Sequence, residues 1–155
     1  MKFELNGKKQ KETRIMNKFW QNWLAVWCAA IGLFGVVLAG GALDATSGLV
    51  KINFALLNGP GVFELDAPMR FSLAVMGSVT IGWSLAMFAA LKAANQLDKR
   101  SGKSVWSLMT LSVGSWYVID SLLSIATGFW LNIIPNTVFM AAFLLPVIKN
   151  GVLKQ

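Results

Sequence analysis

Asp120 is the one acidic side chain well inside a long apolar stretch of this 155-residue chain. An ionised carboxylate near the centre of a membrane costs at least about 2.5–3.5 kcal/mol on insertion scales. The side chain is therefore expected to face protein and to be paired, hydrated or protonated. Tyr117 and Ser124 lie within one helical turn on either side, so polar groups gather around this carboxyl.

Arg70 is the candidate partner of Asp120. It falls in the first turn of an apolar segment, where the helix dipole disfavours a cation, so an acidic partner is expected. Asp44, Glu64 and Asp66 are competing partners nearer the end of the helices. The alternatives are an ion pair that fixes helix register, a functional pocket, and no contact between the two residues.

Asn132 and Asn136 flank Pro135 at the turn between the last two apolar stretches. The final stretch is short, so this turn could dip below the membrane surface, where irregular backbone must be buried in protein or line a wet cavity. We therefore expect Arg70, Tyr117, Asp120 and both asparagines to form an outward-facing polar pocket or an ion-pair site. The simpler interpretation is that the asparagines only cap the turn.

Other catalytic chemistry has little support in the composition. The chain has no histidine and one cysteine, Cys28, which removes the commonest general base and any internal disulfide. It has no phosphate-binding glycine loop, metal-ligand cluster or nucleophile elbow. We therefore expect no catalytic residues, no metal and no cofactor, and the predicted protein is not an enzyme.

The elements that must position these residues are four apolar stretches. The chain is 55% hydrophobic and only 14% charged, against about 25% charged in soluble domains. Spanning a bilayer takes about 20 residues. We predict an all-α integral membrane four-helix bundle. A basic leader covers 1–19 and one domain covers 20–152. The four helices of that domain are expected over about 20–43, 68–92, 105–131 and 133–149. An outer loop over 44–66, containing a short interfacial helix ended by Asn58-Gly-Pro-Gly61, and an inner loop over 93–104 connect them.

Lysine and arginine predict the orientation. If the N-terminus is cytoplasmic, the inner side carries twelve of them and the outer side two, Lys51 and Arg70. Both termini are therefore expected in the cytoplasm, in a multi-pass protein of the bacterial cytoplasmic (inner) membrane. The net charge of +7 would suggest nucleic acid in a soluble protein, but these charges flank apolar stretches, so the lipid bilayer is the expected partner.

Small residues recur every four positions along the second stretch, at Ala74, Ser78, Gly82, Ala86 and Ala90. Helices in lipid associate through close packing of small residues, so this stripe is predicted to hold the bundle together. A period of four favours crossings in which the i±4 ridges interlock. The same stripe could instead bind another subunit or a second copy of the chain.

The string Met69-Arg-Phe71, then Gly82-Trp83, Trp116-Tyr-Val-Ile-Asp120 and Asn136-Thr137 resembles small bacterial four-helix integral membrane proteins of no assigned function. That resemblance implies a fold and no activity, and it places Arg70 and Asp120 among the family-like residues.

Two functions remain open. The first is a non-enzymatic accessory or structural subunit or a self-associating bundle, for which a dry, packed interior with an apolar outer groove is expected. The second is a small transporter or ligand-binding protein that uses Asp120 and Arg70, for which a polar cavity open to the outside is expected.

Overall fold

The described structure is a computed structural model covering residues 16–59 and 63–154. Most of the basic leader predicted over 1–19 lies outside these residues. The described part contains helices and no strand. In chain order the elements are α2 (Lys18–Gly40), η1 (Asp44–Thr46), α3 (Gly48–Asn58), α4 (Ala67–Ala94), α5 (Lys99–Ala126), η2 (Trp130–Asn132) and α6 (Ile133–Lys149).

Capping residues set where the helices begin. Asp66, predicted as the cap of the second helix, accepts a hydrogen bond from the Met69 amide at 2.9 Å, with Pro68 in the first turn. Asp98 caps α5 by accepting from the amides of Arg100 and Ser101 at 3.0 and 3.1 Å. This second cap starts α5 at Lys99, and the helix ends at Ala126. The predicted span over 105–131 was therefore wrong by about one and a half turns at each end.

The short helix expected in the outer loop is present as α3. It ends at Asn58, and Gly59 follows with a φ of 82°, a conformation that glycine adopts without steric strain. Leu49, Ile52 and Leu56 point outward on one side of α3, while Val50 is fully buried on the other. α3 therefore presents one apolar side outward and packs another apolar residue against the protein.

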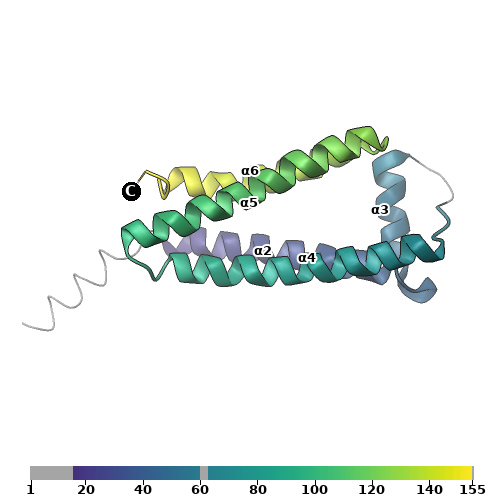
Figure 1. Ribbon diagram of the computed structural model, residues 1–155, viewed down its shortest axis with the longest axis horizontal. Coiled ribbons are helices and arrows are strands. Elements are labelled where there is room, and N and C mark those ends of the chain that lie inside the picture. The colour runs from purple at the N-terminus through teal and green to yellow at the C-terminus, as the bar shows by residue number, and fades with distance from the viewer. Residues whose placement is uncertain (1–15, 60–62, 155) are drawn as a thin grey trace, which may run out of the picture.

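The long helices form two antiparallel pairs. α2 lies along α4, and α5 lies along α6 (Figure 1). The pairs are close together at the end that holds the C-terminus and diverge toward the other end, where α3 runs across from one pair to the other (Figure 1). Phe54 of α3 packs against Phe129, beyond α5, with ring centroids 6.0 Å apart. α3 thus bridges the diverging ends.

The α2–α4 contact corrects the predicted packing stripe. α4 buries Leu73, Gly77, Ser84, Met87, Leu91 and Ala94, which follow alternating steps of three and four residues. In the predicted stripe Ser78, Gly82 and Ala86 are exposed and Ala74 and Ala90 are only partly buried, and a Cβ on Gly82 would meet nothing within 4 Å. A period of four drifts around a helix, whereas the 3.5-residue repeat keeps facing one partner.

Two glycines, Gly35 and Gly77, face each other where the helix backbones approach closely. A Cβ on Gly77 would lie 2.6 Å from the Gly35 oxygen, and a Cβ on Gly35 would lie 2.9 Å from the Gly77 oxygen. One to two turns further along, the Ser84 hydroxyl donates to the Cys28 carbonyl at 2.7 Å. Cys28 is buried and acts as a small packing residue.

The core where the pairs meet is aromatic. Trp27 of α2 packs against Phe143 of α6, with ring centroids 5.2 Å apart, and its indole donates to the Phe139 carbonyl at 2.9 Å. Pro146 has no N–H to donate to the Ala142 carbonyl one turn earlier. The Trp23 indole donates to that carbonyl at 2.9 Å and satisfies it.

Four helices are long and apolar enough to cross a membrane: Lys18–Gly40, Ala67–Ala94, Lys99–Ala126 and Trp130–Lys149. Large apolar side chains cover their outward faces, among them Leu33, Leu85, Leu111 and Val138, each more than 60% exposed. Such continuous apolar surface is unusual on soluble monomers and is suited to lipid.

Candidate functional site

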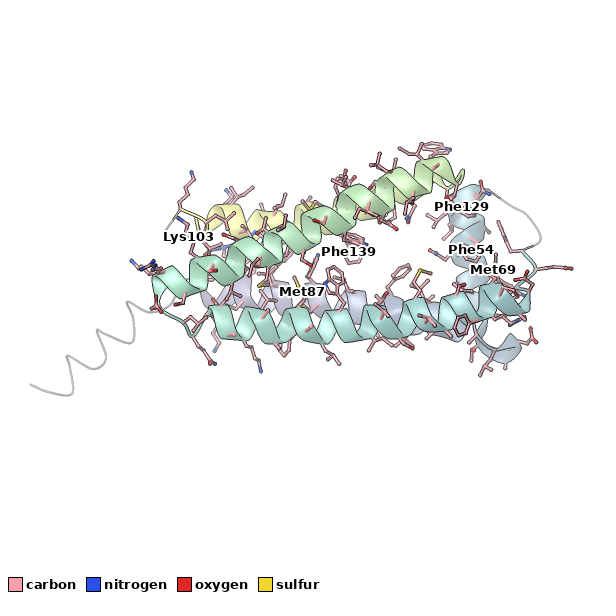
Figure 2. The ribbon with its side chains drawn as sticks, viewed as in Figure 1. Phe54, Met69, Met87, Lys103, Phe129 and Phe139 are labelled. Atoms are coloured by element: carbon pink, nitrogen blue, oxygen red, sulfur yellow. The ribbon has the colours of Figure 1, made fainter. Side chains whose placement is uncertain are left out.

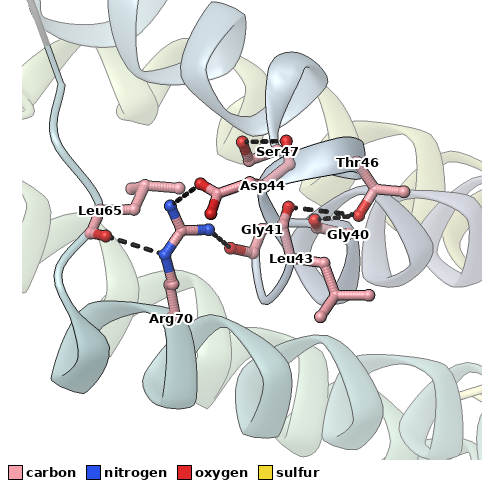
Figure 3. A network of polar contacts seen from close by, with 8 residues as sticks. All are labelled: Gly40, Gly41, Leu43, Asp44, Thr46, Ser47, Leu65 and Arg70. Carbon is pink, nitrogen blue, oxygen red and sulfur yellow. Dashed lines mark hydrogen bonds and ion pairs between the residues drawn. The ribbon is translucent and has the colours of Figure 1, made fainter.

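Arg70 lies in a polar cluster at the end of the α2–α4 pair that is near α3 (Figure 3). Its guanidinium pairs with Asp44 and donates to the Leu65 carbonyl at 2.9 Å and the Gly41 carbonyl at 3.5 Å. Asp44 was one of the competing acidic partners. The predicted Arg70–Asp120 pair is therefore wrong.

The reason for this pairing is the order of the helices in space. Asp44 follows α2 directly, and Arg70 lies in the first turn of α4, so the antiparallel α2–α4 pair brings them together. Asp120 is on α5, in the other pair. The Arg70 contacts tie the end of α2 to the segment that leads into α4, which is a structural role.

Asp120 lies in a second polar cluster, which the sequence did predict in part. The carboxamides of Asn132 and Asn136 both donate to Asp120 Oδ2, the first at 3.0 Å. The Asn132 amide also donates to the Ser124 hydroxyl at 3.0 Å. Two pairs at i,i+4 spacing thus face each other, Asp120 with Ser124 on α5 and Asn132 with Asn136 at the start of α6.

The charge of this cluster is not balanced by a basic residue. In residues 16–59 and 63–154, the ion pair of Arg70 with Asp44 is the one present, and Asp120 takes no part in it. Because α5 covers Lys99–Ala126, Asp120 lies about 11 Å from the helix centre, toward the C-terminal end of α5. The carboxyl therefore lies in the last quarter of the helix.

Tyr117 stands one turn before Asp120 but binds elsewhere. Its hydroxyl lies 3.1 Å from the hydroxyl of Thr137 on α6. The five candidate residues therefore separate into three places: Arg70 with Asp44, Tyr117 with Thr137, and Asp120 with Asn132 and Asn136. Only the last set forms the convergent group that the sequence predicted.

A cavity of about 400 Å³ lies between the diverging helix pairs. Its lining comes from every long helix, from α3 and from η2: Ile31, Phe34, Asn53, Val79, Thr80, Trp83, Trp116, Asn132, Pro135 and Phe139. Figure 2 shows Phe139 in the space between the pairs. Seven of these ten residues are apolar or aromatic, so the cavity is neither the polar pocket nor the fully packed interior expected from sequence.

Asn132 connects the cavity with the Asp120 cluster, because this residue lines the cavity and its side chain binds Asp120. Sequence reasoning missed Asn53 and Thr80, which supply the other polar groups of the lining. Thr80 lies midway between the buried positions Gly77 and Ser84, and that spacing was the available signal. Asn53 had no signal of its own, since its position depends on α3 crossing the helix ends.

The corrected pairing gives a testable double-mutant result. Arg70→Gln and Asp44→Asn should couple, by about 0.2–1 kcal/mol as for other partly exposed ion pairs. Arg70→Gln and Asp120→Asn share no partner, so their losses should add within about 0.3–0.5 kcal/mol. The three single and two double variants would be compared by thermal unfolding in detergent. Coupling of Arg70 with Asp120 and none with Asp44 would contradict the structure.

Comparisons with protein-family models, with curated proteins and with solved structures found no match for the chain.

Proposed function

We propose that this chain is a non-enzymatic, multi-pass protein of the bacterial cytoplasmic membrane that binds an amphiphilic molecule in the cavity beneath α3. The observation that carries the proposal is the cavity itself, which opens between two helix pairs held apart by a bridging helix. Its volume of about 400 Å³ falls within the usual range of ligand pockets, about 300–1,000 Å³.

The orientation follows from the basic residues. Five basic residues flank the helix ends that lie away from α3: Lys92, Lys99, Arg100, Lys103 and Lys149. Two basic residues lie at the other end, Lys51 on α3 and Arg70 at the start of α4. With the positive end inside, both termini are cytoplasmic and α3 lies at the outer surface. The cavity then opens in the outer half of the membrane.

The lining determines the class of ligand. Trp83, Trp116 and Phe139 offer broad apolar faces, and the rings of the two tryptophans lie 6.0 Å apart. Asn53 and Asn132 supply hydrogen-bonding groups near α3. An apolar wall with a few polar groups suits a molecule with an apolar body and a small polar head, such as a fatty acid or a single-chain lipid.

A second candidate is an accessory subunit or a self-associating bundle. The exposed face of α4 favours it, because Ser78, Gly82 and Ala86 leave the backbone open to another helix. The two functions use different residues of α4 and are compatible in one protein.

Filling the cavity tests the first candidate. Thr80→Phe places a ring in the lining, while Ser78→Phe, two residues away on the exposed face of the same helix, serves as the matched control. We expect Thr80→Phe to lower binding of a fatty acid at least about tenfold, or 1.4 kcal/mol, with Ser78→Phe unchanged. Native mass spectrometry of the purified variants would measure the bound fraction. Equal binding by wild type and Thr80→Phe would refute the proposal.

A further inference from the structure

We propose that Asp120, Ser124, Asn132 and Asn136 form a binding site for a small monovalent metal cation, of which Na⁺ is the representative. The site lies beside the amphiphile cavity and shares one residue with it, Asn132. Its link to the cavity rests on the proposed function, whereas the cation site itself does not.

The first argument is the supply of oxygen atoms. Four polar side chains from α5, η2 and α6 are joined by three hydrogen bonds, two to Asp120 and one to Ser124. A carboxamide carries an oxygen opposite its NH₂ group, and rotation by a half turn exchanges the two. Asn132 and Asn136 can therefore turn their oxygens toward Asp120, and the cluster then offers carboxylate, two carboxamide and hydroxyl oxygens. Hard cations prefer these ligands.

The second argument is the buried hydroxyl of Ser121. This residue is only 9% exposed, and its Oγ finds no hydrogen-bond partner in the part of the chain that the structure describes. Ser121 and Ser124 are three residues apart and share a face of α5. Buried hydroxyls are normally bonded, so an unpartnered one on the helix face that also carries Ser124 is available to a guest bound there.

The third argument is charge. Both asparagines donate to Asp120 Oδ2, and within residues 16–59 and 63–154 no hydrogen bond reaches Oδ1. The N-terminus of α6 stabilises the negative charge of the carboxylate through the helix dipole, which is equivalent to about half an elementary charge at most. The dipole therefore does not balance the full charge of Asp120. A monovalent cation neutralises the single carboxylate, whereas a divalent one would leave a net positive charge in apolar surroundings, which is costly.

Cation binding has a consequence for the cavity. The Asn132 amide would turn its oxygen to the cation and withdraw its NH₂ from Asp120 and Ser124. Because Asn132 also lines the cavity, this rotation changes the polar group presented to an amphiphile. The cation would thereby alter which head groups the cavity accepts.

The test is a thermal-unfolding series on the purified full chain, with NaCl replaced by choline chloride at constant ionic strength. We expect Na⁺ to raise Tm by about 3–10 °C at 10 to 100 times its dissociation constant. Asp120→Asn keeps a hydrogen-bond acceptor for both asparagines and should abolish the rise. Glu64→Gln removes an exposed carboxylate elsewhere and should retain it.

Binding of ²²Na⁺ to wild type and Asp120→Asn gives a second readout that does not depend on unfolding. Binding in the wild type and its loss in the variant support the site. A Tm that is equal in Na⁺ and choline, a rise that survives Asp120→Asn, or a response to pH alone would each overturn it. Binding of fatty acid by the cavity is measured separately, so failure of one proposal is distinguishable from failure of the other.

Discussion

Gly77→Leu is expected to separate α2 from α4 and to destabilise the protein by at least about 3 kcal/mol, the upper end of the usual cost of overpacking. A Cβ at this position would lie 2.6 Å from the Gly35 oxygen and 2.7 Å from the Ala39 Cα. These are backbone atoms, which cannot rotate away as a side chain would. The contact therefore has to open, and it is the most extensive helix contact in the molecule.

Gly82→Leu is the matched control, with the same substitution on the same helix. No atom lies within 4 Å of a Cβ at Gly82, so its stability in detergent should remain close to that of the wild type. Size-exclusion chromatography and thermal unfolding of both variants would measure the difference. A larger loss from Gly82→Leu than from Gly77→Leu would restore the small-residue stripe as the packing face and contradict the α2–α4 geometry.

Phe143→Ala is expected to cost about 3–5 kcal/mol, as other truncations of buried aromatic residues do. Phe143 is fully buried and packs against Trp27, so its loss leaves a void where the two helix pairs meet. Phe71→Ala is the control, because Phe71 is 70% exposed on the outward face of α4. Equal unfolding temperatures for the two variants would show that the pairs do not meet at Phe143.

Local features of the fold could be predicted because neighbouring residues determine them. Asp66 with Pro68 marked the start of α4, and Asn58-Gly59 marked the end of α3. Asn132 and Asn136 met Asp120 because a short turn joins their helices, so sequence spacing nearly fixed the geometry. In each case few conformations compete with the observed one.

Features that depend on which helices are neighbours could not be predicted. Arg70 has acidic residues available on several sides, and the choice of Asp44 follows from α4 lying against α2. The stripe from Ala74 to Ala90 has the composition of a packing face, yet composition cannot show whether the partner helix belongs to this chain or to another. The cavity depends on the divergence of two pairs, which no single segment encodes.

The central claim is that an amphiphile occupies the cavity between the helix pairs, and photolabelling tests it most directly. The wild-type protein in membranes would be irradiated with a fatty acid that carries a diazirine, and the labelled residues would be identified by mass spectrometry. The account predicts labels on Trp83, Trp116 or Phe139 that excess unlabelled fatty acid displaces. Labels confined to the lipid-facing residues Leu33, Leu111 and Val138, with no displacement by excess fatty acid, would contradict it.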